Sequence, residues 1–335
     1  MAAACRVRAY WSDGIPHADP FVSHRPRPVT EKLMTSRRLR AEGVSGTVSN
    51  IVALYGDPVA GNPTSRMQNA AFRSVGVDWQ YLDFRVAPSQ LEAAVRAART
   101  LEFSGLNLTI PHKVAVVPLL DDLEASAEIC GAVNTVRRDP DGRFVGLNTD
   151  GMGFLWALRD AGLAPDGLDV VLLGAGGAAR AVAVELALAG AARIQVANRS
   201  SDRRDSLVAL LRSRTRAAAS GLEWTGRLRV PPCDVLVDCT PVGMGTGAAA
   251  HEMVAVDLRG LAPATIACDL NPETSDSALL RMARTLGHRT LGGLPMLARQ
   301  GAAGFTAWTG LQAPLELMSA ELESAVREMH ARSRA

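Results

Sequence analysis

The chain has 335 residues, of which 47% are hydrophobic and 21% charged, and its formal net charge is +2. This length predicts two or three domains, and the composition excludes a disordered or low-complexity chain. The small net charge gives no electrostatic reason to expect nucleic acid or a membrane surface as a partner. The five cysteines form no Cys-x-x-Cys pair, which argues against a disulfide framework or a zinc site and favours the cytoplasm.

Residues 1–46 differ from the rest of the chain. They are rich in Arg, Pro and Ser and have no sustained periodicity, so we interpret them as a mobile extension, with a basic partner-binding arm as the alternative. No apolar run typical of a secretory signal opens the sequence. Arg180 and Glu185 interrupt the most apolar stretch, residues 170–192, so no membrane span is expected.

From Asn50 onward, strand and helix patterns alternate in two blocks. In the first block the periodicity predicts strands at 50–55, 79–86 and 105–110 and helices at 65–75 and 88–100. The second block has predicted strands at 169–173, 193–197, 234–238 and 265–269, an Ala-rich helix ending near 189, and a helical segment at 297–332 broken near Pro314. Such alternation predicts an α/β fold with parallel sheets in two domains.

A glycine-rich turn follows the strand at 169–173. Its sequence, Gly174-Ala-Gly-Gly-Ala-Ala179, fits the G-x-G-x-x-A pattern between a strand and a helix, where close backbone approach and a helix N-terminus bind a pyrophosphate. The residue after the next strand is Asn198, followed by Arg199 and Ser200. An NAD site usually carries a carboxylate there, whereas arginine and serine can bind a 2′-phosphate. We therefore predict NADP rather than NAD; Arg203 and Arg204 are equally well explained as solvated helix charge.

One lysine stands out in the first block, because the chain has only Lys32 and Lys113. Lysine can transfer a proton at neutral pH and arginine cannot. Lys113 closes the segment Asn107-Leu-Thr-Ile-Pro-His-Lys113 at a predicted strand end, where open α/β sheets place their chemistry. The segments Gly131-Ala-Val-Asn-Thr135 and Asn148-Thr-Asp-Gly151 follow it in polar turns.

Together with Gly174-Ala-Gly-Gly-Ala178, Asn198-Arg-Ser200 and Met296-Leu-Ala-Arg-Gln300, these segments resemble the shikimate dehydrogenase family over residues 51–310. The family also includes quinate and aminoshikimate dehydrogenases. The resemblance implies NADPH-dependent reduction of 3-dehydroshikimate to shikimate. It also implies a substrate domain at 47–150 completed by returning helices at 297–332, and a Rossmann-type NADP domain at 151–296.

The resemblance further implies roles for individual residues. Lys113 and Asp150 are implied as the catalytic pair that moves the proton, and no metal is implied. The residues implied to contact the substrate are Asn62, Thr64, Asn107, Thr109, Asn134, Thr149 and Gln300. The residues implied to contact the cofactor are Gly174, Gly176, Gly177, Ala178, Asn198, Arg199, Ser200, Thr240, Met244, Gly293 and Met296.

Two departures from the family concern the substrate. Asn62 and Thr64 stand where the family usually carries Ser-x-Ser, and Pro272 stands where it tends to carry a tyrosine. The catalytic pair is intact, so the alternative within the family is another substrate: quinate, aminoshikimate or another carbocyclic hydroxy acid. The alternative from another class of protein is a non-catalytic ligand sensor. We expect a small-molecule substrate, no macromolecular ligand, and a monomer or homodimer.

Overall fold

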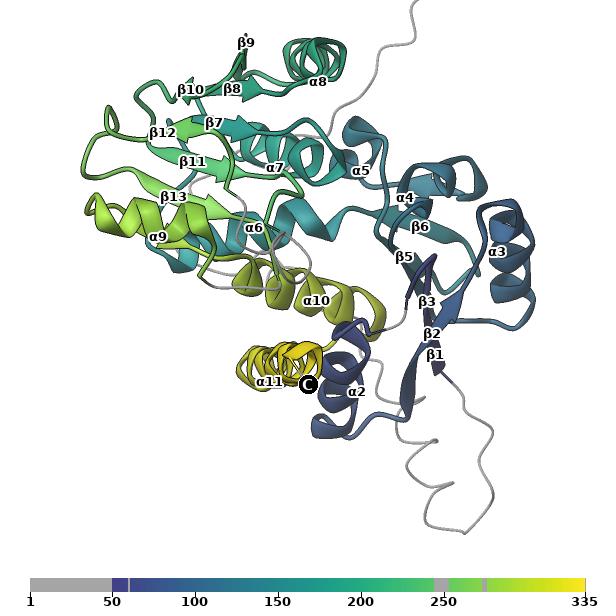
Figure 1. Cartoon of the computed structure of the whole chain (residues 1–335). Coiled ribbons are helices and arrows are strands. Elements are labelled where there is room, and N and C mark those ends of the chain that lie inside the picture. The colour runs from purple at the N-terminus through teal and green to yellow at the C-terminus, as the bar shows by residue number, and fades with distance from the viewer. Residues whose placement is uncertain (1–49, 60, 244–252, 273–275, 335) are drawn as a thin grey trace, which may run out of the picture. The chain divides into compact units, whose positions relative to one another are not determined.

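The computed structural model describes residues 50–59, 61–243, 253–272 and 276–334, all within one compact unit, residues 45–335. The extension predicted at 1–46 and the predicted cofactor residue Met244 lie outside this described part. Two six-stranded sheets and the helices around them form the architecture (Figure 1). None of the helices described is long and apolar enough to cross a membrane.

The first sheet has the strand order β2-β1-β3-β5-β6-β4. Its strands are β1 (Asn50–Gly56), β2 (Trp79–Arg85), β3 (Gly105–Leu108), β4 (Asp122–Leu123), β5 (Thr135–Arg138) and β6 (Phe144–Leu147). The helices of this part of the chain are α2 (Thr64–Ser74), α3 (Leu91–Thr100), α4 (His112–Ala115), α5 (Ala125–Cys130) and α6 (Thr149–Asp160), with short 3-10 turns at Pro88–Gln90 and Val117–Leu119. β1 runs parallel to β2 and β3, but β5 is antiparallel to both β3 and β6. The expectation of a parallel sheet is therefore confirmed for the three predicted strands, β1, β2 and β3, but it was wrong for the sheet as a whole, because the unpredicted strand β5 makes it mixed.

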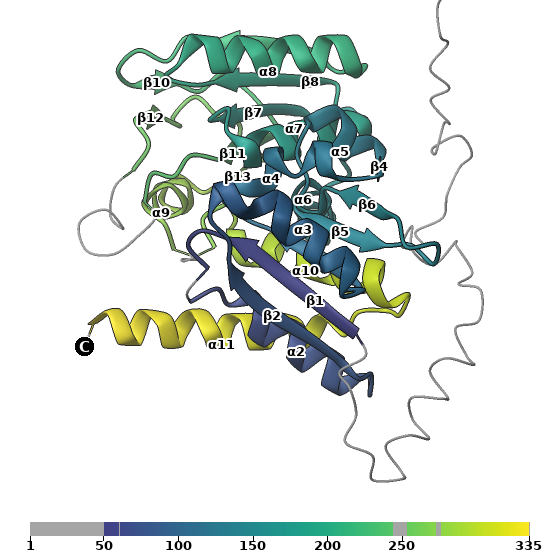
Figure 2. The ribbon, with the colours of Figure 1, turned by 90° about the vertical axis from the view of Figure 1, so that its right-hand side faces the viewer.

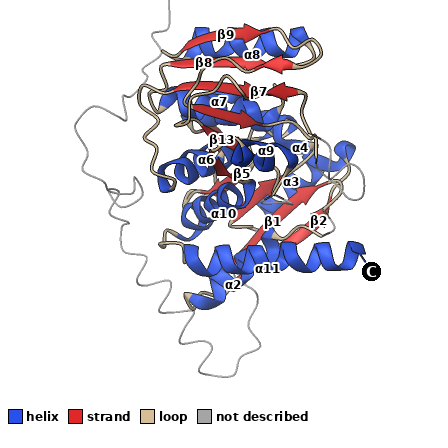
Figure 3. Ribbon diagram, turned by 60° about the vertical axis from the view of Figure 1, so that its left-hand side comes forward, coloured by secondary structure: helices blue, strands red, loops and turns tan. Residues whose placement is uncertain are grey.

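The second sheet has the order β14-β13-β11-β7-β8-β9, and all its neighbours are parallel. Its strands are β7 (Asp169–Leu173), β8 (Arg193–Ala197), β9 (Ala218–Leu222), β11 (Val235–Asp238), β13 (Ile266–Asp269) and β14 (Arg289–Leu291), and β10 (Leu228–Arg229) pairs separately with β12 (Val256–Asp257). The helices are α7 (Gly177–Leu188), α8 (Ser201–Arg214), α9 (Ala278–Thr285), α10 (Gly293–Thr309) and α11 (Leu315–Arg334). Figure 3 shows α8 beside β9 at one edge of this sheet. The order places β7, with its glycine-rich turn, centrally in the sheet.

Both sheets bury both faces, which explains their apolar strands. In β1, Ala53 and Tyr55 belong to one core and Val52 and Leu54 to another, as the period of two requires. In β7, alternate residues likewise divide between two cores. Each sheet is therefore packed on both faces, next to the strand ends that carry the polar residues.

The chain returns to the first sheet at its C-terminal end. Helix α10 packs against α6, and α11 packs along α2 (Figure 2). Phe305 and Trp308 from α10 join the core formed by β1, β2 and α2, and Trp308 Nε1 donates a hydrogen bond to the Val136 carbonyl at 2.9 Å. The predicted break near Pro314 is confirmed, since α10 ends at Thr309 and α11 begins at Leu315. This return carries Gln300 to the side of α6.

Candidate active site

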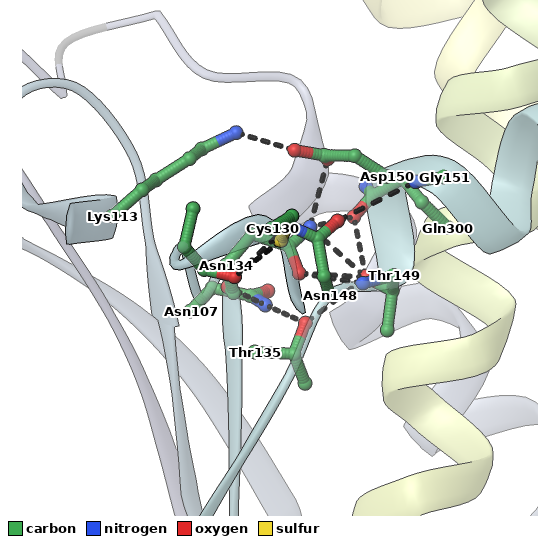
Figure 4. Close-up of polar contacts among 11 residues, drawn as sticks. Asn107, Lys113, Cys130, Asn134, Thr135, Asn148, Thr149, Asp150, Gly151 and Gln300 are labelled. Carbon is green, nitrogen blue, oxygen red and sulfur yellow. Dashed lines mark hydrogen bonds and ion pairs between the residues drawn. The ribbon is translucent and has the colours of Figure 1, made fainter. Parts of the chain in front are cut away.

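Lys113 and Asp150 form an ion pair beyond the carboxyl end of strand β3 in the first sheet. Lys113 lies in α4, shortly after β3, and its Nζ donates a hydrogen bond to Asp150 Oδ2 at 2.7 Å (Figure 4). Asp150 lies in the first turn of α6, where the positive end of the helix dipole favours a carboxylate. The side chains are 32% and 16% exposed, so the ammonium is held in one place while still accessible to a small molecule.

The first turn of α6 is fixed from several sides. Asn148 caps the helix by accepting a hydrogen bond from the Gly151 N–H at 3.4 Å, and its own Nδ2 donates to the Ala132 carbonyl at 3.1 Å. A Cβ on Gly151 would lie 2.5 Å from the Ala181 carbonyl oxygen of α7. A Cβ on Gly153 would lie 2.6 Å from a backbone oxygen of α10. The two glycines thus let α6 pack closely against both neighbouring helices and bring Asp150 and Gln300 together.

Asn134 connects the ion pair to a buried polar network. Its Oδ1 accepts the Thr149 N–H at 2.8 Å, which fixes the orientation of the amide. Its Nδ2 consequently faces Asp150 and donates to Oδ1 at 2.8 Å. Both Asp150 oxygens are therefore engaged, Oδ1 by Asn134 and Oδ2 by Lys113. Gln300 joins the network through Oε1, which lies 3.3 Å from Thr149 Oγ1 and 3.4 Å from Asn134 Nδ2.

Asn107 lies at the inner end of the same network. Its Nδ2 donates to the Asn134 carbonyl and to Thr135 Oγ1, both at 2.9 Å. Its Oδ1 accepts a hydrogen bond from the Tyr81 hydroxyl at 2.7 Å. Tyr81 was missed as a functional residue because it has the pattern of an ordinary strand residue. Thr135 closes the segment Gly131–Thr135 of the resemblance but was given no role of its own.

The loop before α2 has a different arrangement from the network. Asn62 Oδ1 accepts the Thr64 N–H at 2.9 Å, so its amide oxygen is used locally at the start of α2. Thr64 is 6% exposed. The Thr109 methyl group occupies the space that a side chain at Gly56 would need. Within the described residues, none of these three side chains is hydrogen-bonded to the network around Asp150, and their contact with a substrate stays a prediction.

The glycine-rich turn has the backbone geometry needed for a dinucleotide. Gly174 has a φ of 104°, a value that favours glycine. Gly176 is the N-cap of α7 and Gly177 its first residue, and the space in which their Cβ atoms would lie is open to 4 Å. Ala178 follows in the first helical turn. An exposed backbone at the start of a 12-residue helix fits a bound pyrophosphate.

The residues after β8 fit a 2′-phosphate. Asn198 takes the place of the usual carboxylate, and its Nδ2 donates to the Ser200 carbonyl at 2.9 Å. Ser200 caps α8 through its Oγ, and Arg199 is exposed, with no bonded partner in the part of the chain that is described. Arg204 is different, because Asp205 and Glu223 bind its guanidinium, each at 2.7 Å. Arg199 is therefore available to an anion, and Arg204 is engaged by carboxylates.

The remaining predicted cofactor residues that the structure describes lie after β11 (Thr240) and at the start of α10 (Gly293 and Met296). Thr240 N–H donates to Asp238 Oδ1 at 2.9 Å. Burial, and then the neighbouring charge of Asp269, raises the pKa of Asp238 to about 7. Gly293 begins α10, and a Cβ there would lie 2.5 Å from the Leu270 carbonyl oxygen. Met296 is 9% exposed on the same helix.

Comparison with known proteins identifies the family. The family model described as the shikimate dehydrogenase substrate binding domain matches residues 54–136, and that of the shikimate 5′-dehydrogenase C-terminal domain matches residues 293–323. A shikimate dehydrogenase (NADP(+)) of Methanopyrus kandleri is 44% identical over 274 residues, which cover 81% of this chain and 93% of that protein.

Two solved structures share the fold over most of their length. The 5-ketofructose reductase of Gluconobacter sp. strain CHM43 has a TM-score of 0.79 and 38% identity, covering 83% of this chain and 99% of that one. The shikimate 5-dehydrogenase of Thermus thermophilus, in complex with NADP(H) and shikimate, has a TM-score of 0.71 and 32% identity, covering 82% and 99%. The predicted resemblance is confirmed: this chain belongs to the shikimate dehydrogenase family.

Proposed function

We propose that the chain catalyses the reversible, NADP-dependent reduction of 3-dehydroshikimate to shikimate. The observation that carries this proposal is the 2.7 Å ion pair between Lys113 Nζ and Asp150 Oδ2 at the edge of a buried amide and hydroxyl network. Reduction of a ketone leaves negative charge on its oxygen, which needs a proton donor within hydrogen-bond reach. Lysine is a donor of this kind, and hydroxyl and amide groups suit a substrate with several hydroxyls.

The residues have distinct roles in this reaction. NADPH supplies the hydride when it is bound. Lys113 donates a proton from Nζ to the substrate oxygen, and its partial exposure lets it recover a proton from water. Asp150 holds the ammonium in position, and Asn134 holds Asp150. In the direction of oxidation Lys113, in its neutral form, accepts the hydroxyl proton.

We assign NADP to the glycine-rich turn and to Arg199 and Ser200. The open backbone at Gly176 and Gly177, and the absence of a carboxylate at Asn198, support this assignment. Asn62, Thr64, Thr109, Thr149 and Gln300 belong to the substrate side of the proposal.

The domain assignment is part of the same proposal. We place the substrate domain at 47–150 with 297–332 and the cofactor domain at 151–296. The boundary runs through α6, which packs against both α7 and α10. We also place the enzyme in the cytoplasm, which suits the free thiols of Cys130, Cys233, Cys239 and Cys268.

A second candidate is reduction of a neutral keto sugar. Asn62 and Thr64 replace the usual Ser-x-Ser, the Asn62 oxygen is engaged by the Thr64 N–H, and the similar 5-ketofructose reductase is 38% identical. A site without the serine pair has fewer hydroxyl donors for a carboxylate, which favours an uncharged polyol. Quinate and aminoshikimate remain the alternatives among acids.

The deciding experiment measures initial rates with purified protein. NADP⁺ reduction is followed with shikimate and with quinate, NADPH oxidation with 5-ketofructose, and each assay is repeated with NAD(H). The highest kcat/KM with shikimate and NADP⁺ supports the main proposal. Turnover of 5-ketofructose without turnover of shikimate overturns it in favour of the second candidate, and no turnover of any of them favours the sensor.

A further inference from the structure

We propose that Tyr81 and Thr135 are positioning residues: they belong to a buried chain of hydrogen bonds, fixed also by the Asn134 carbonyl and the Thr149 N–H, in which Gln300 presents its amide Nε2 to the substrate. The inference rests on the proposed function and concerns which hydrogen-bond donors and acceptors the same site presents to the substrate hydroxyls. The backbone groups, the Asn134 carbonyl and the Thr149 N–H, have a fixed polarity and orient the two Asn amides, whereas the hydroxyls can both donate and accept.

The chain starts at a permanent donor. Tyr81 is 2% exposed, and its hydroxyl lies 2.7 Å from Asn107 Oδ1. Burial raises the pKa of the Tyr81 hydroxyl well above its usual range, so the proton stays on the oxygen. Asn107 must therefore turn its oxygen toward Tyr81.

The orientation of Asn107 determines the next link. With Oδ1 toward Tyr81, the two Nδ2 hydrogens reach the Asn134 carbonyl and Thr135 Oγ1. A flipped amide would place Oδ1 against a carbonyl oxygen that carries no proton, which is unfavourable in a buried site. Asn107 keeps only one free lone pair, on Oδ1, for a substrate hydroxyl.

The next link is the hydrogen bond between the hydroxyls of Thr135 and Thr149. Both side chains are fully buried, and their hydroxyl oxygens lie 3.0 Å apart. Thr135 already accepts from Asn107, so both hydroxyl hydrogens find partners only when Thr135 donates to Thr149. Thr149 then donates to Asn134 Oδ1 at 3.2 Å or Gln300 Oε1 at 3.3 Å.

Gln300 is the outer end of the chain. Its Oε1 faces the Thr149 hydroxyl and Asn134 Nδ2, and the opposite orientation would set an amide donor against a donor. Its Nε2 is therefore directed away from the network and, within the described residues, has no hydrogen-bond partner. The site thus offers a donor at Gln300, which fits a substrate oxygen with a free lone pair.

The test removes the starting donor and keeps the ring. Tyr81→Phe preserves the packing of the ring against Trp308 (centroids 6.1 Å apart). It leaves the buried Asn107 Oδ1 without its donor, so Asn107 is held by fewer hydrogen bonds. We expect the KM for shikimate to rise about tenfold, with little change in the KM for NADP⁺. Calorimetric titration with shikimate, which needs no turnover, should give the same rise in Kd.

The matched control is Tyr55→Phe. Tyr55 is 4% exposed in the neighbouring strand β1, and its hydroxyl donates to the Ala94 carbonyl at 3.2 Å, outside the network. This variant also loses one hydrogen bond and should keep wild-type kinetics. If Tyr81→Phe keeps the wild-type KM and loses only thermal stability, as Tyr55→Phe does, the inference is overturned.

A second pair of variants tests the middle of the chain. Thr135→Val has nearly the same shape but no hydroxyl, and should raise the KM as Tyr81→Phe does. Thr135→Ser keeps the hydroxyl and should restore the wild-type KM. Equal effects of Val and Ser would contradict the chain. If wild-type protein neither binds nor oxidises shikimate, the proposed function fails first, which separates the two outcomes.

Discussion

The two sheets present their functional groups in opposite ways. At the first sheet, polar side chains are buried and bonded to one another: Asn107, Asn134, Thr149 and Gln300 are each at most 7% exposed. At the second sheet, the proposed cofactor groups are open backbone at Gly176 and Gly177 and exposed side chains at Arg199 and Ser200. In the first region the side chains are already hydrogen-bonded to one another without a ligand. In the second region the N–H groups and side chains are free to turn toward a charged ligand.

The difference follows from the ligands that the regions are proposed to bind. A polyol must be distinguished by the direction of each hydrogen bond, which requires side chains of fixed polarity. Phosphates are bound by charge and by N–H groups at a helix end, which tolerate more freedom. We therefore expect single-atom changes to be severe at the first sheet and graded at the second.

The largest expected effect is at the proton donor. Lys113→Met should lower kcat by about 10³-fold and change the KM for NADP⁺ little, as measured by steady-state kinetics. Lys113→Arg keeps the charge next to Asp150 but has no transferable proton, so it should remain almost as inactive. An Arg variant with near wild-type kcat would show that charge alone is sufficient.

The next effect compares two glycines. Gly153→Ala forces a methyl group against the backbone of α10, so it should lower the free energy of unfolding by about 2–4 kcal/mol in urea titration. Gly176→Ala places its methyl in open space and should leave stability nearly unchanged while weakening NADP⁺ binding. Equal loss of stability in the two variants would contradict the comparison between the sheets.

A smaller, graded effect is expected at Arg199. Arg199→Ala should raise the KM for NADP⁺ about tenfold or more, because a charge-assisted contact to the 2′-phosphate is lost. The KM for NAD⁺, which has no such phosphate, serves as the internal control and should not rise. A parallel rise for both cofactors would place Arg199 at another part of the dinucleotide.

The smallest effect concerns Asp238. Its pKa is raised from 3.8 to about 7 in the folded protein, so ionisation costs stability as the pH rises through this window. Asp238→Asn cannot ionise and should be more stable than wild type at pH 8 by at least about 1 kcal/mol, out of the about 4 kcal/mol to which a pKa shift of this size corresponds, with the advantage fading toward pH 4. Thermal unfolding across that range measures the difference, and an advantage that grows toward low pH would contradict the assignment.

The sequence predicted regular elements well where periodicity is strong. The strand expected at 193–197 is β8, and the glycine-rich turn joins β7 to α7 as expected. The antiparallel strands β5 and β6 were not predicted, because the segments 131–135 and 148–151 that flank them were interpreted as polar turns.

Part of the site was predicted, and this part came from the family resemblance and not from residue patterns alone. The structure brings Lys113, Asp150, Asn134, Thr149, Asn107 and Gln300 together by hydrogen bonds, although Gln300 lies 166 residues from Asn134. Tyr81 gave no signal, and Thr135 was part of a matching segment without a role of its own, because the direction of a hydrogen bond depends on contacts between strands that a single sequence does not reveal.

The loop before α2 has a consequence for the evolution of new activities. In the described part of the chain, the side chains of Asn62 and Thr64 share no hydrogen bond with Lys113, Asp150 or Asn134. Because this segment is proposed to contact the substrate, we expect mutations in it to change the substrate without disturbing the proton donor or its support. A laboratory selection for a different polyol would accordingly randomise residues 61–64 first and leave the rest of the chain as it is.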